Sequence, residues 1–194
     1  FAVGKDESKM GQLGSSTNEI ILEDCRVPRE NLLGNENEGF KIAVKELAGG
    51  RIGIGSMALG IGLAAMDFAT GYANERVQFD VPIIQHQAIQ WMIADNYTSL
   101  EAARLLLLKA AYLKENNKPF MKEASMAKLF ATEAANKACY DAMQILGGYG
   151  YTKDYPIERM YRDVRVTSIY EGTSQIQRLI IAKSYMDDAK VNAG

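Results

Sequence analysis

Long and almost unbroken helical patterns constrain the fold of this chain more than any other feature of its sequence. From about residue 37 onwards, residues that favour turns cluster at only three places, namely 71–82, 116–119 and 147–150. Between these places, apolar residues recur every three or four positions, which is typical of helices buried along one face. The pattern predicts helices at about 38–73, 83–116, 119–146 and 174–187, with a short turn near 156–162.

The third predicted helix carries small residues along one face. These are Ala124, Ala127, Ala131, Ala134, Ala138 and Ala142, followed by Ile145. Because small side chains leave room for a neighbouring backbone, the stripe predicts close packing of another helix. Helices of about 30 residues are roughly 45 Å long, and short connections join them. The expected fold is therefore mainly α, an antiparallel four-helix bundle.

Three helix ends carry recognisable signals. Pro119 suits the first turn of a helix, and the glycines after Leu146 predict the end of the third helix. Ser174, with Gln177 three residues later, predicts a capping box at the start of the last helix.

Residues 1–36 differ from the rest of the chain, because glycine, polar and charged residues surround one short apolar segment, residues 20–22. This composition predicts two or three short strands. So few strands cannot cover a hydrophobic face. We therefore expect residues 1–36 to be the end of an incomplete middle β domain, and residues 37–194 to be the helical bundle domain. Since the opening segment resembles a domain interior, we expect the chain to be truncated or processed.

The composition excludes several classes of protein. The chain has 47% hydrophobic residues, 24% charged residues and a net charge of −2, which gives it no general attraction to nucleic acid. Cys25 and Cys139 show no disulfide or zinc spacing, and no metal site is indicated. No apolar stretch reaches the roughly 18 residues that a membrane span needs, and no secretory signal is recognisable. We expect a reducing compartment, with neither a membrane span nor secretion.

The densest polar cluster lies between Gln144 and Gln177. It contains a run of glycines at 147–150, three arginines at 159, 162 and 165, and Glu171. Glycines and a helix start can hold a phosphate-bearing cofactor. From these residues alone, a plain helix stop, a solvated charged turn and a carboxylate near a helix dipole are favoured over a site. The lone His86, which has no triad or metal partner motif, is interpreted as structural.

Several motifs taken together resemble one known family. Lys9-Met10-Gly11-x-x-Gly14-Ser15-Ser16-Thr17, Glu23-Asp24-x-x-Val27-Pro28, Asn31-x-Leu33-Gly34 and Gly39-Phe40 occur in that order. Gly50-Arg51-Ile52-Gly53-Ile54-Gly55, the segment 144–151, Tyr161-Arg162-Asp163 and the segment 170–177 follow. In this order the motifs resemble the C-terminal half of the acyl-CoA dehydrogenase family, of the short-chain or short/branched-chain type.

The resemblance implies a reaction. Members of the family remove the α-proton of an acyl-CoA thioester with a carboxylate, while a hydride leaves the β-carbon for FAD. Glu171, in Tyr170-Glu171-Gly172-Thr173, matches that base. One subgroup of the family carries its base just before the arginine that matches Arg51, but this sequence has Gly50 there. The resemblance therefore favours Glu171.

The resemblance also implies binding residues. For the substrate they are Ala48, Gly49, Gly50, Arg51, Tyr170 and Gly172. For FAD they are Arg76, Phe79, Gln87, Gln144, Ile145, Leu146, Gly147, Gly148, Thr173, Ser174 and Gln175. Two positions depart from the family pattern: Ala48 replaces an acidic or amide residue, and Asp80 replaces a glycine.

Partners and location follow from the same resemblance. It implies an electron-transferring flavoprotein as electron acceptor and a homo-oligomer, either a dimer or a tetramer, in which some residues contact the flavin of a neighbouring subunit. The compartment would be the cytoplasm in a bacterium or the mitochondrial matrix in a eukaryote. Because the N-terminal helical domain is missing, we expect the fragment to be inactive alone. A flavin-free helical scaffold, an oxidase and an enoyl-CoA reductase remain as alternatives on this fold.

Overall fold

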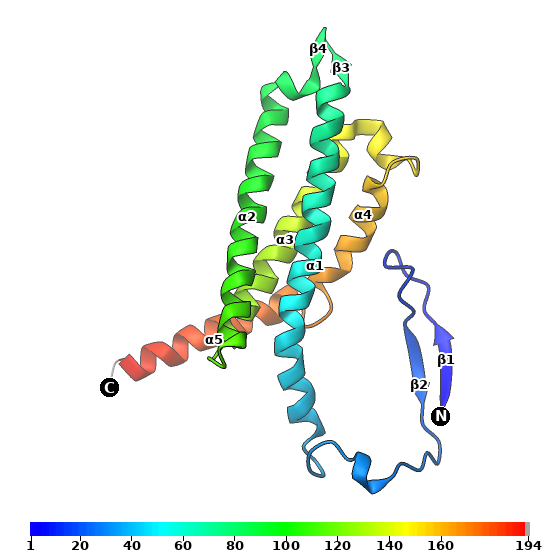
Figure 1. The fold of residues 1–194 in the computed structure, drawn as a ribbon, viewed down its shortest axis with the longest axis vertical. Helices are drawn as coiled ribbons and strands as arrows, with labels where there is room; N and C mark the ends of the chain where they lie inside the picture. Colours follow the sequence, from blue (N-terminus) through cyan, green and yellow to red (C-terminus); the bar gives the residue numbers. More distant parts are fainter. Residues whose placement is uncertain (193–194) are drawn as a thin grey trace.

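Three long helices form the centre of the computed structural model, which describes residues 1–192 (Figure 1). They are α1 (Gly39–Glu75), α2 (Gln87–Glu115) and α3 (Met121–Leu146). The short helix α4 (Ile157–Val164) lies against α3 and α1, and α5 (Ser174–Asn192) packs on α3. Consecutive long helices run in opposite directions (Figure 1), which confirms the predicted mainly α bundle. The segment expected to be a short turn near 156–162 is α4, an eight-residue helix.

Close contact between α1 and α3 holds the bundle together. Gly55 and Gly62 of α1 face the small residues of α3: a Cβ added at Gly62 would lie 3.1 Å from Ala135 Cα. The alanine stripe is therefore confirmed as a packing surface, with Ala135 rather than Ala134 fully buried. Since the two backbones almost touch, side chains that both helices carry into this contact are held in fixed positions.

The helix ends agree with the sequence at one place and differ at another. Gly147 ends α3 with a φ of 60°, a conformation that glycine adopts without strain. At the start of α5, the Ile176 backbone N–H donates a hydrogen bond of 3.3 Å to Thr173 Oγ1. Thr173 is therefore the capping residue and the predicted Ser174 capping box is wrong, because Ser174 is already inside the helix and Gln177 points elsewhere.

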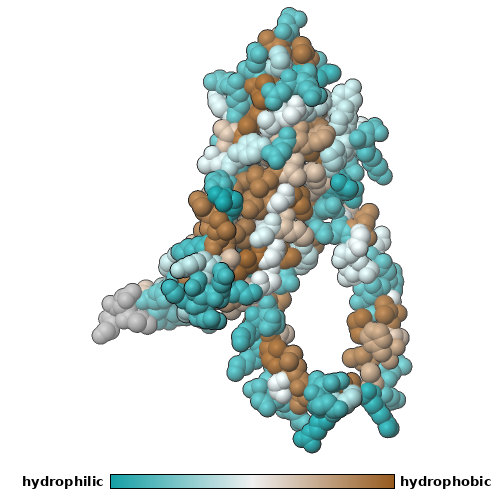
Figure 2. Space-filling model, in the orientation of Figure 1, coloured by the Kyte–Doolittle hydropathy of each residue, from teal (hydrophilic) through white to brown (hydrophobic). Residues whose placement is uncertain are grey.

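The N-terminal residues form a two-stranded antiparallel ribbon whose strands stand apart from the bundle, while the loop between the strands contacts α4 (Figure 1). Strand β1 (Ala2–Asp6) pairs with β2 (Asn18–Ile21), and a register irregularity separates Val3 from Asp6. Apolar side chains are exposed on this ribbon and on the bundle surface (Figure 2). A two-stranded ribbon with exposed apolar side chains needs further protein to cover it.

Short elements connect the ribbon and the helices. A second hairpin, β3 (Val77–Gln78) with β4 (Val81–Pro82), links α1 to α2. The 3₁₀ helices are η1 (Arg29–Asn31), η2 (Ile83–Gln85), η3 (Gly147–Tyr151) and η4 (Arg165–Ser168).

One helix bears on the expectation about membranes. By length and composition alone, α1 could cross a membrane, because an 18-residue window of it has a mean hydropathy of 1.6. The run from Ile52 to Met66 contains no charged residue, and its small apolar residues raise the hydropathy. A core helix of a soluble protein passes the same test, and α1 packs along α3 and α2.

Candidate functional site

Glu171 lies in the loop between η4 and α5, in an uncommon backbone conformation. Its φ is 54° and that of Gly172 is 87°, so two successive residues are left-handed. A side chain such as glutamate adopts this conformation only when its surroundings impose it. Two buried donors do so here. Gln177 Nε2 donates to the Gly172 carbonyl at 2.8 Å and to the Glu171 carbonyl at 3.3 Å, and Lys128 Nζ donates to the Gly172 carbonyl at 2.8 Å.

The Glu171 carboxylate is directed at α1. A Cβ added at Gly50 would lie 2.7 Å from Glu171 Oε2, so only glycine leaves room for the carboxylate there. Within the part of the chain that the structure describes, Glu171 Oε2 is buried and has no hydrogen-bond partner. A buried carboxylate oxygen without a donor is costly. It is therefore positioned to accept a proton.

Arg51 follows Gly50 on α1 and points into the bundle. It is 5% exposed, and its Nη1 donates to Ser125 Oγ at 3.3 Å and contacts Met121 Sδ at 2.8 Å. Ala48 is also buried, whereas Gly49 faces the Lys114 ammonium at the end of α2. Gly50, Arg51, Tyr170 and Gly172 thus lie beside Glu171, whereas Gly49 does not contact it, and Arg51 and Ala48 expose almost no surface to a ligand.

Burial changes the protonation of the groups around Glu171. The pKa of Lys128 falls to about 8, because burial penalises its charge and Arg51 repels it, while Glu171 opposes the shift. Burial also lowers the pKa of Arg51. The pKa of Tyr170 is raised by burial and, to a smaller extent, by the Glu171 carboxylate. One carboxylate and two cations thus share a small and poorly hydrated space.

A second group of predicted residues lies at the upper end of the bundle in Figure 1. Arg76, Ile145, Leu146, Gly147 and Gly148 line one pocket of about 470 Å³. A Cβ added at either glycine would meet nothing within 4 Å, so the backbone is open there. The Arg76 guanidinium lies 5.9 Å from the centre of the Tyr149 ring. A cation and exposed peptide groups in one hollow suit an anionic ligand.

The remaining residues of this group lie around the rim. Gln87 and Gln144 are exposed and do not line the pocket. Phe79 is 87% exposed and, with Asp80, forms the two-residue turn of the β3–β4 hairpin, where both have positive φ. Such turns favour Asn, Asp and Gly. Aspartate is therefore compatible with the position where the family usually carries glycine.

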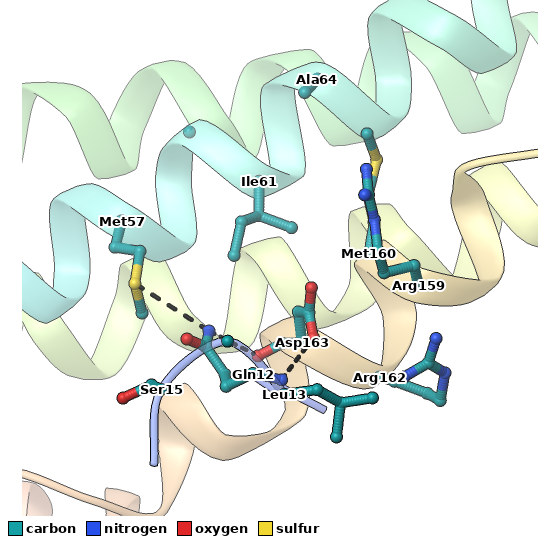
Figure 3. Close-up of a pocket in the computed structure, with 12 residues that line it drawn as sticks. Gln12, Leu13, Ser15, Met57, Ile61, Ala64, Arg159, Met160, Arg162 and Asp163 are labelled. Carbon is teal, nitrogen blue, oxygen red and sulfur yellow. Dashed lines mark hydrogen bonds between the residues drawn. The ribbon is translucent and has the colours of Figure 1, made fainter. Parts of the chain in front are cut away.

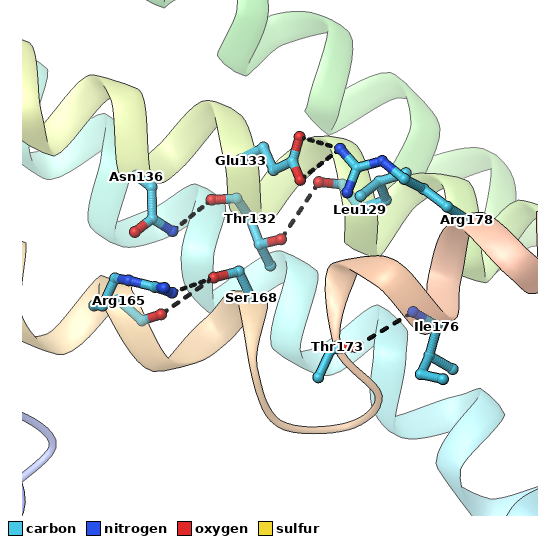
Figure 4. A network of polar contacts seen from close by, with 9 residues as sticks. All are labelled: Leu129, Thr132, Glu133, Asn136, Arg165, Ser168, Thr173, Ile176 and Arg178. Atoms are coloured by element: carbon cyan, nitrogen blue, oxygen red, sulfur yellow. Dashed lines mark hydrogen bonds and ion pairs between the residues drawn. The ribbon is translucent and has the colours of Figure 1, made fainter.

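Thr173, Ser174 and Gln175 line a different pocket, of about 400 Å³, between α3, η4 and the start of α5 (Figure 4). Arg165 and Ser168 form its other side and are hydrogen bonded to each other at 2.7 Å. Ser174 is 6% exposed, and its Oγ has no partner among the described residues. Figure 4 also shows the Arg178–Glu133 ion pair that fastens α5 to α3.

The predicted cofactor residues are therefore separated into two groups. Gly50, beside Glu171, lies in α1, and Arg76 is the first residue after the same helix. At about 1.5 Å per residue, the 26 positions between them correspond to about 39 Å. Along α3 the two pockets are closer, because Asn136 lines the pocket of Thr173 and Ile145 lines that of Arg76, nine positions or about 14 Å away.

Sequence reasoning missed two features of the site. The first is Lys128, whose position on the alanine face of α3 was the available signal. The second is a cavity of about 740 Å³ between the loop at 12–15, α1 and α4 (Figure 3). There the Gln12 N–H donates to Asp163 Oδ1 at 2.5 Å. Arg162 Nη1 donates to the Met10 carbonyl at 2.9 Å. The Arg162 side chain therefore binds the N-terminal loop and is not simply a solvated charge.

Comparison with known families agrees with this geometry. Residues 37–186 match the model of the acyl-CoA dehydrogenase C-terminal domain. The chain belongs to the acyl-CoA dehydrogenase family. The family prediction is thereby confirmed.

Individual relatives extend the acyl-CoA dehydrogenase assignment. Acryloyl-CoA reductase (NADH) of Anaerotignum propionicum is 55% identical over 186 residues, which cover 96% of this chain and 47% of the relative. The mitochondrial short-chain specific acyl-CoA dehydrogenase of Homo sapiens is 55% identical over 182 residues, covering 94% of this chain and 44% of that protein. The chain thus spans slightly less than half the length of these relatives.

A solved acyl-CoA dehydrogenase structure has the same fold. The Bacillus anthracis acyl-CoA dehydrogenase complexed with FAD superposes with a TM-score of 0.92 at 33% identity. The match covers 100% of this chain and 36% of that one.

Proposed function

We propose that this chain forms the C-terminal half of a FAD-dependent acyl-CoA dehydrogenase and that Glu171 removes the α-proton of the substrate. The observation that carries the proposal is the buried Glu171 Oε2, which lacks a hydrogen-bond donor and is held on a strained loop. Strain and unpaired polar atoms are costly, and active sites are where proteins retain them.

The residues around Glu171 suit proton abstraction beside a thioester. The α-proton is weakly acidic, so its removal needs a positioned base and stabilisation of the charge that develops on the thioester oxygen. Glu171 would take the proton on Oε2. Gly50 leaves the carboxylate room, and Gly172, where an added Cβ would lie 2.6 Å from Gln177 Nε2, leaves room for that side chain to hold the loop. Lys128 and Arg51 supply positive charge nearby.

FAD fits the residues that the resemblance assigns to it. When bound, it would supply the hydride acceptor. Arg76 and the open backbone at Gly147 and Gly148 suit an anionic part of the cofactor. At the other end, the unpaired Ser174 Oγ lies beside Thr173 and Gln175. The relative complexed with FAD supports the same cofactor.

The family resemblance supports a homo-oligomer, either a dimer or a tetramer, and the two separate pockets are compatible with it. Each chain would contribute Thr173, Ser174 and Gln175 to one flavin and Arg76 with Gly147 and Gly148 to the flavin of a neighbouring subunit. The apolar side chains exposed on the bundle are compatible with burial between subunits (Figure 2).

Other parts of the proposal concern the rest of the protein. Residues 1–36 are the end of the middle β domain, and residues 37–194 are the C-terminal helical domain. Residues 1–194 alone are inactive, because they span less than half the length of the relatives and the rest of that length would complete the site. The electron acceptor is an electron-transferring flavoprotein, and the compartment is the bacterial cytoplasm or the mitochondrial matrix, since one relative is mitochondrial.

A second candidate function has a specific observation in its favour. One relative at 55% identity is named acryloyl-CoA reductase (NADH), so the same site would reduce an enoyl-CoA. Anaerobic mixing with butyryl-CoA alone, and with 2-butenoyl-CoA plus a reductant, separates the two directions. A flavin-free scaffold is disfavoured, because it has no use for a strained and unpaired Glu171.

The test of the proposed base is Glu171→Gln in the full-length protein. Loss of flavin bleaching on anaerobic addition of butyryl-CoA is the expected result, because the amide cannot accept the proton. Glu115→Gln, on an exposed turn at the end of α2, is the matched control. Bleaching of Glu171→Gln at the wild-type rate would contradict the proposal, as would a wild-type protein that binds no flavin.

A further inference from the structure

We propose that Lys128 is a positioning residue of the reaction, because its ammonium group holds the Gly172 carbonyl and thereby fixes the direction of the Glu171 carboxylate. The inference rests on the proposed role of Glu171 as the base. It adds a residue from α3, outside the loop that carries the base, to the parts of the protein on which proton abstraction depends.

The burial of Lys128 is the first observation. The side chain is 0% exposed and is the largest fully buried side chain of the described residues. Lysine is almost never fully buried unless it has a partner. Here Nζ donates to a backbone carbonyl at 2.8 Å, and no carboxylate of the described residues forms a salt bridge with it. A neutral carbonyl offsets the desolvation of an ammonium group poorly, so this arrangement is costly to the fold.

The second observation is the redundancy of the hydrogen bond. The Gly172 carbonyl already accepts a bond from Gln177 Nε2 at the same distance, 2.8 Å. Satisfying that carbonyl therefore does not require a buried cation. Two donors, one from α3 and one from α5, instead hold one oxygen, and this restrains the position of the carbonyl more strongly than one donor does.

The third observation is the conformation that these bonds fix. In a trans peptide the C=O and N–H groups point in opposite directions. Holding the Gly172 carbonyl inward therefore keeps the Thr173 N–H outward and prevents the peptide from flipping. A flip would change ψ of Gly172 and φ of Thr173, so the loop that begins at the left-handed Glu171 would follow another path into α5. The Glu171 carboxylate would then leave the space beside Gly50.

The backbone contact between α3 and α1 extends this effect to the site. Lys128 lies where α3 meets Gly55, since a Cβ there would be 3.5 Å from Lys128 Cα. Thus α3, which carries Lys128, packs directly on α1, which carries Gly50. The charged groups that face Lys128 are Arg51 from α1 and Glu171 from the loop.

The experiment compares three full-length holoenzymes: wild type, Lys128→Met and the control Lys109→Met. Lys109 is an exposed lysine on α2, so the control removes an equal charge away from the loop. Two quantities are measured: the rate of anaerobic flavin bleaching by butyryl-CoA, and the dissociation constant of 2-butenoyl-CoA. Lys128→Met should bleach about 10-fold to 100-fold more slowly, while the dissociation constant changes less than about threefold. Lys109→Met should match the wild type.

Amide hydrogen exchange gives a readout that does not depend on activity. The N–H groups of Ile176 and Gln177, which donate to Thr173, should exchange faster in Lys128→Met, while the interior of α3 keeps its protection. If Lys128→Met does not accumulate with bound flavin, Lys128→Gln, a shorter and uncharged donor, is measured in the same way with the same expectation.

Two results would overturn the positioning role. One is bleaching within about twofold of wild type in the lysine variant; the other is a loss of ligand affinity as large as the loss of bleaching rate. Failure of the proposed function appears elsewhere, as a wild type that does not bleach or a Glu171→Gln variant that does. The two failures are therefore distinguishable.

Discussion

The carboxylate of Glu171 and the bare backbone of Gly50 share one space, because a Cβ added at Gly50 would lie 2.7 Å from Glu171 Oε2. The two residues are 121 positions apart in the sequence and meet where α1 passes the loop before α5. A glycine in the interior of a helix is unfavourable, so its presence here is explained by the carboxylate that it accommodates.

Gly50→Ala tests this relationship directly. The added methyl group displaces the carboxylate, so the rate of flavin bleaching by acyl-CoA should fall at least about tenfold. Gly53→Ala is the matched control on the same helix, since nothing lies within 4 Å of an added Cβ there. It should raise the free energy of unfolding by about 0.5–1 kcal/mol and leave bleaching unchanged. Equal bleaching rates in the two variants would show that the contact is unimportant.

A base placed on α1 should work in the same space. In the double variant Gly50→Glu with Glu171→Gly, the new carboxylate projects from α1 to the place that Glu171 Oε2 occupies. It should restore part of the bleaching that Glu171→Gly loses, because the position of a base matters more than the element that carries it. The comparison is the bleaching rate of the double variant against Glu171→Gly alone. Equal bleaching rates in these two proteins would show that a carboxylate on α1 does not reach the place of the Glu171 carboxylate.

The turn at Asp80 offers a test of the pocket that Arg76, Gly147 and Gly148 line. Asp80→Asn removes a negative charge four positions after Arg76 and keeps a residue type that tolerates a positive φ. FAD should bind about twofold to fivefold more tightly at low salt, and the difference should shrink as salt is added. The free energy of unfolding should change by less than about 0.5 kcal/mol. Titration of the apoprotein with FAD at two salt concentrations measures the effect, and weaker binding would contradict it.

The depressed pKa of Lys128 predicts a pH dependence of stability. The folded protein releases this proton near pH 8, whereas the unfolded chain keeps it up to the ordinary value of 10.5. Between these values the unfolded state binds more protons, so the free energy of unfolding should rise with pH. Denaturant titrations over this range should show the rise relative to Lys128→Met, which has no proton to release. Parallel curves for the two proteins would exclude the effect.

The long helices and the α1–α3 contact could be predicted from the sequence, because both depend on periodic patterns. The glycine stop at Gly147 was equally visible. The Thr173 cap was not, since Thr173 and Ser174 both suit a cap and only the path of the preceding loop decides between them. The helix α4 is short and highly polar, so its pattern resembled a turn.

The candidate site was less predictable, because it depends on contacts between distant segments. Glu171 was found through a family resemblance. Its relation to Gly50 follows only from the way the loop folds against α1. Lys128 stood on the small-residue face of α3, three positions before Ala131, and a charged residue on such a face was a signal of a buried polar contact. The site residues themselves stay predictions until variants are measured.

The distance between Gly50 and Arg76 along α1 has a genetic consequence. If each chain serves two flavins, a subunit defective at Arg76 and a subunit defective at Glu171 damage different sites in a mixed oligomer. A pair of such subunits contains one site with both defects and one with neither. Two alleles that are each inactive alone would then complement each other within the same cell, whereas two alleles altered at the same end of the bundle would not.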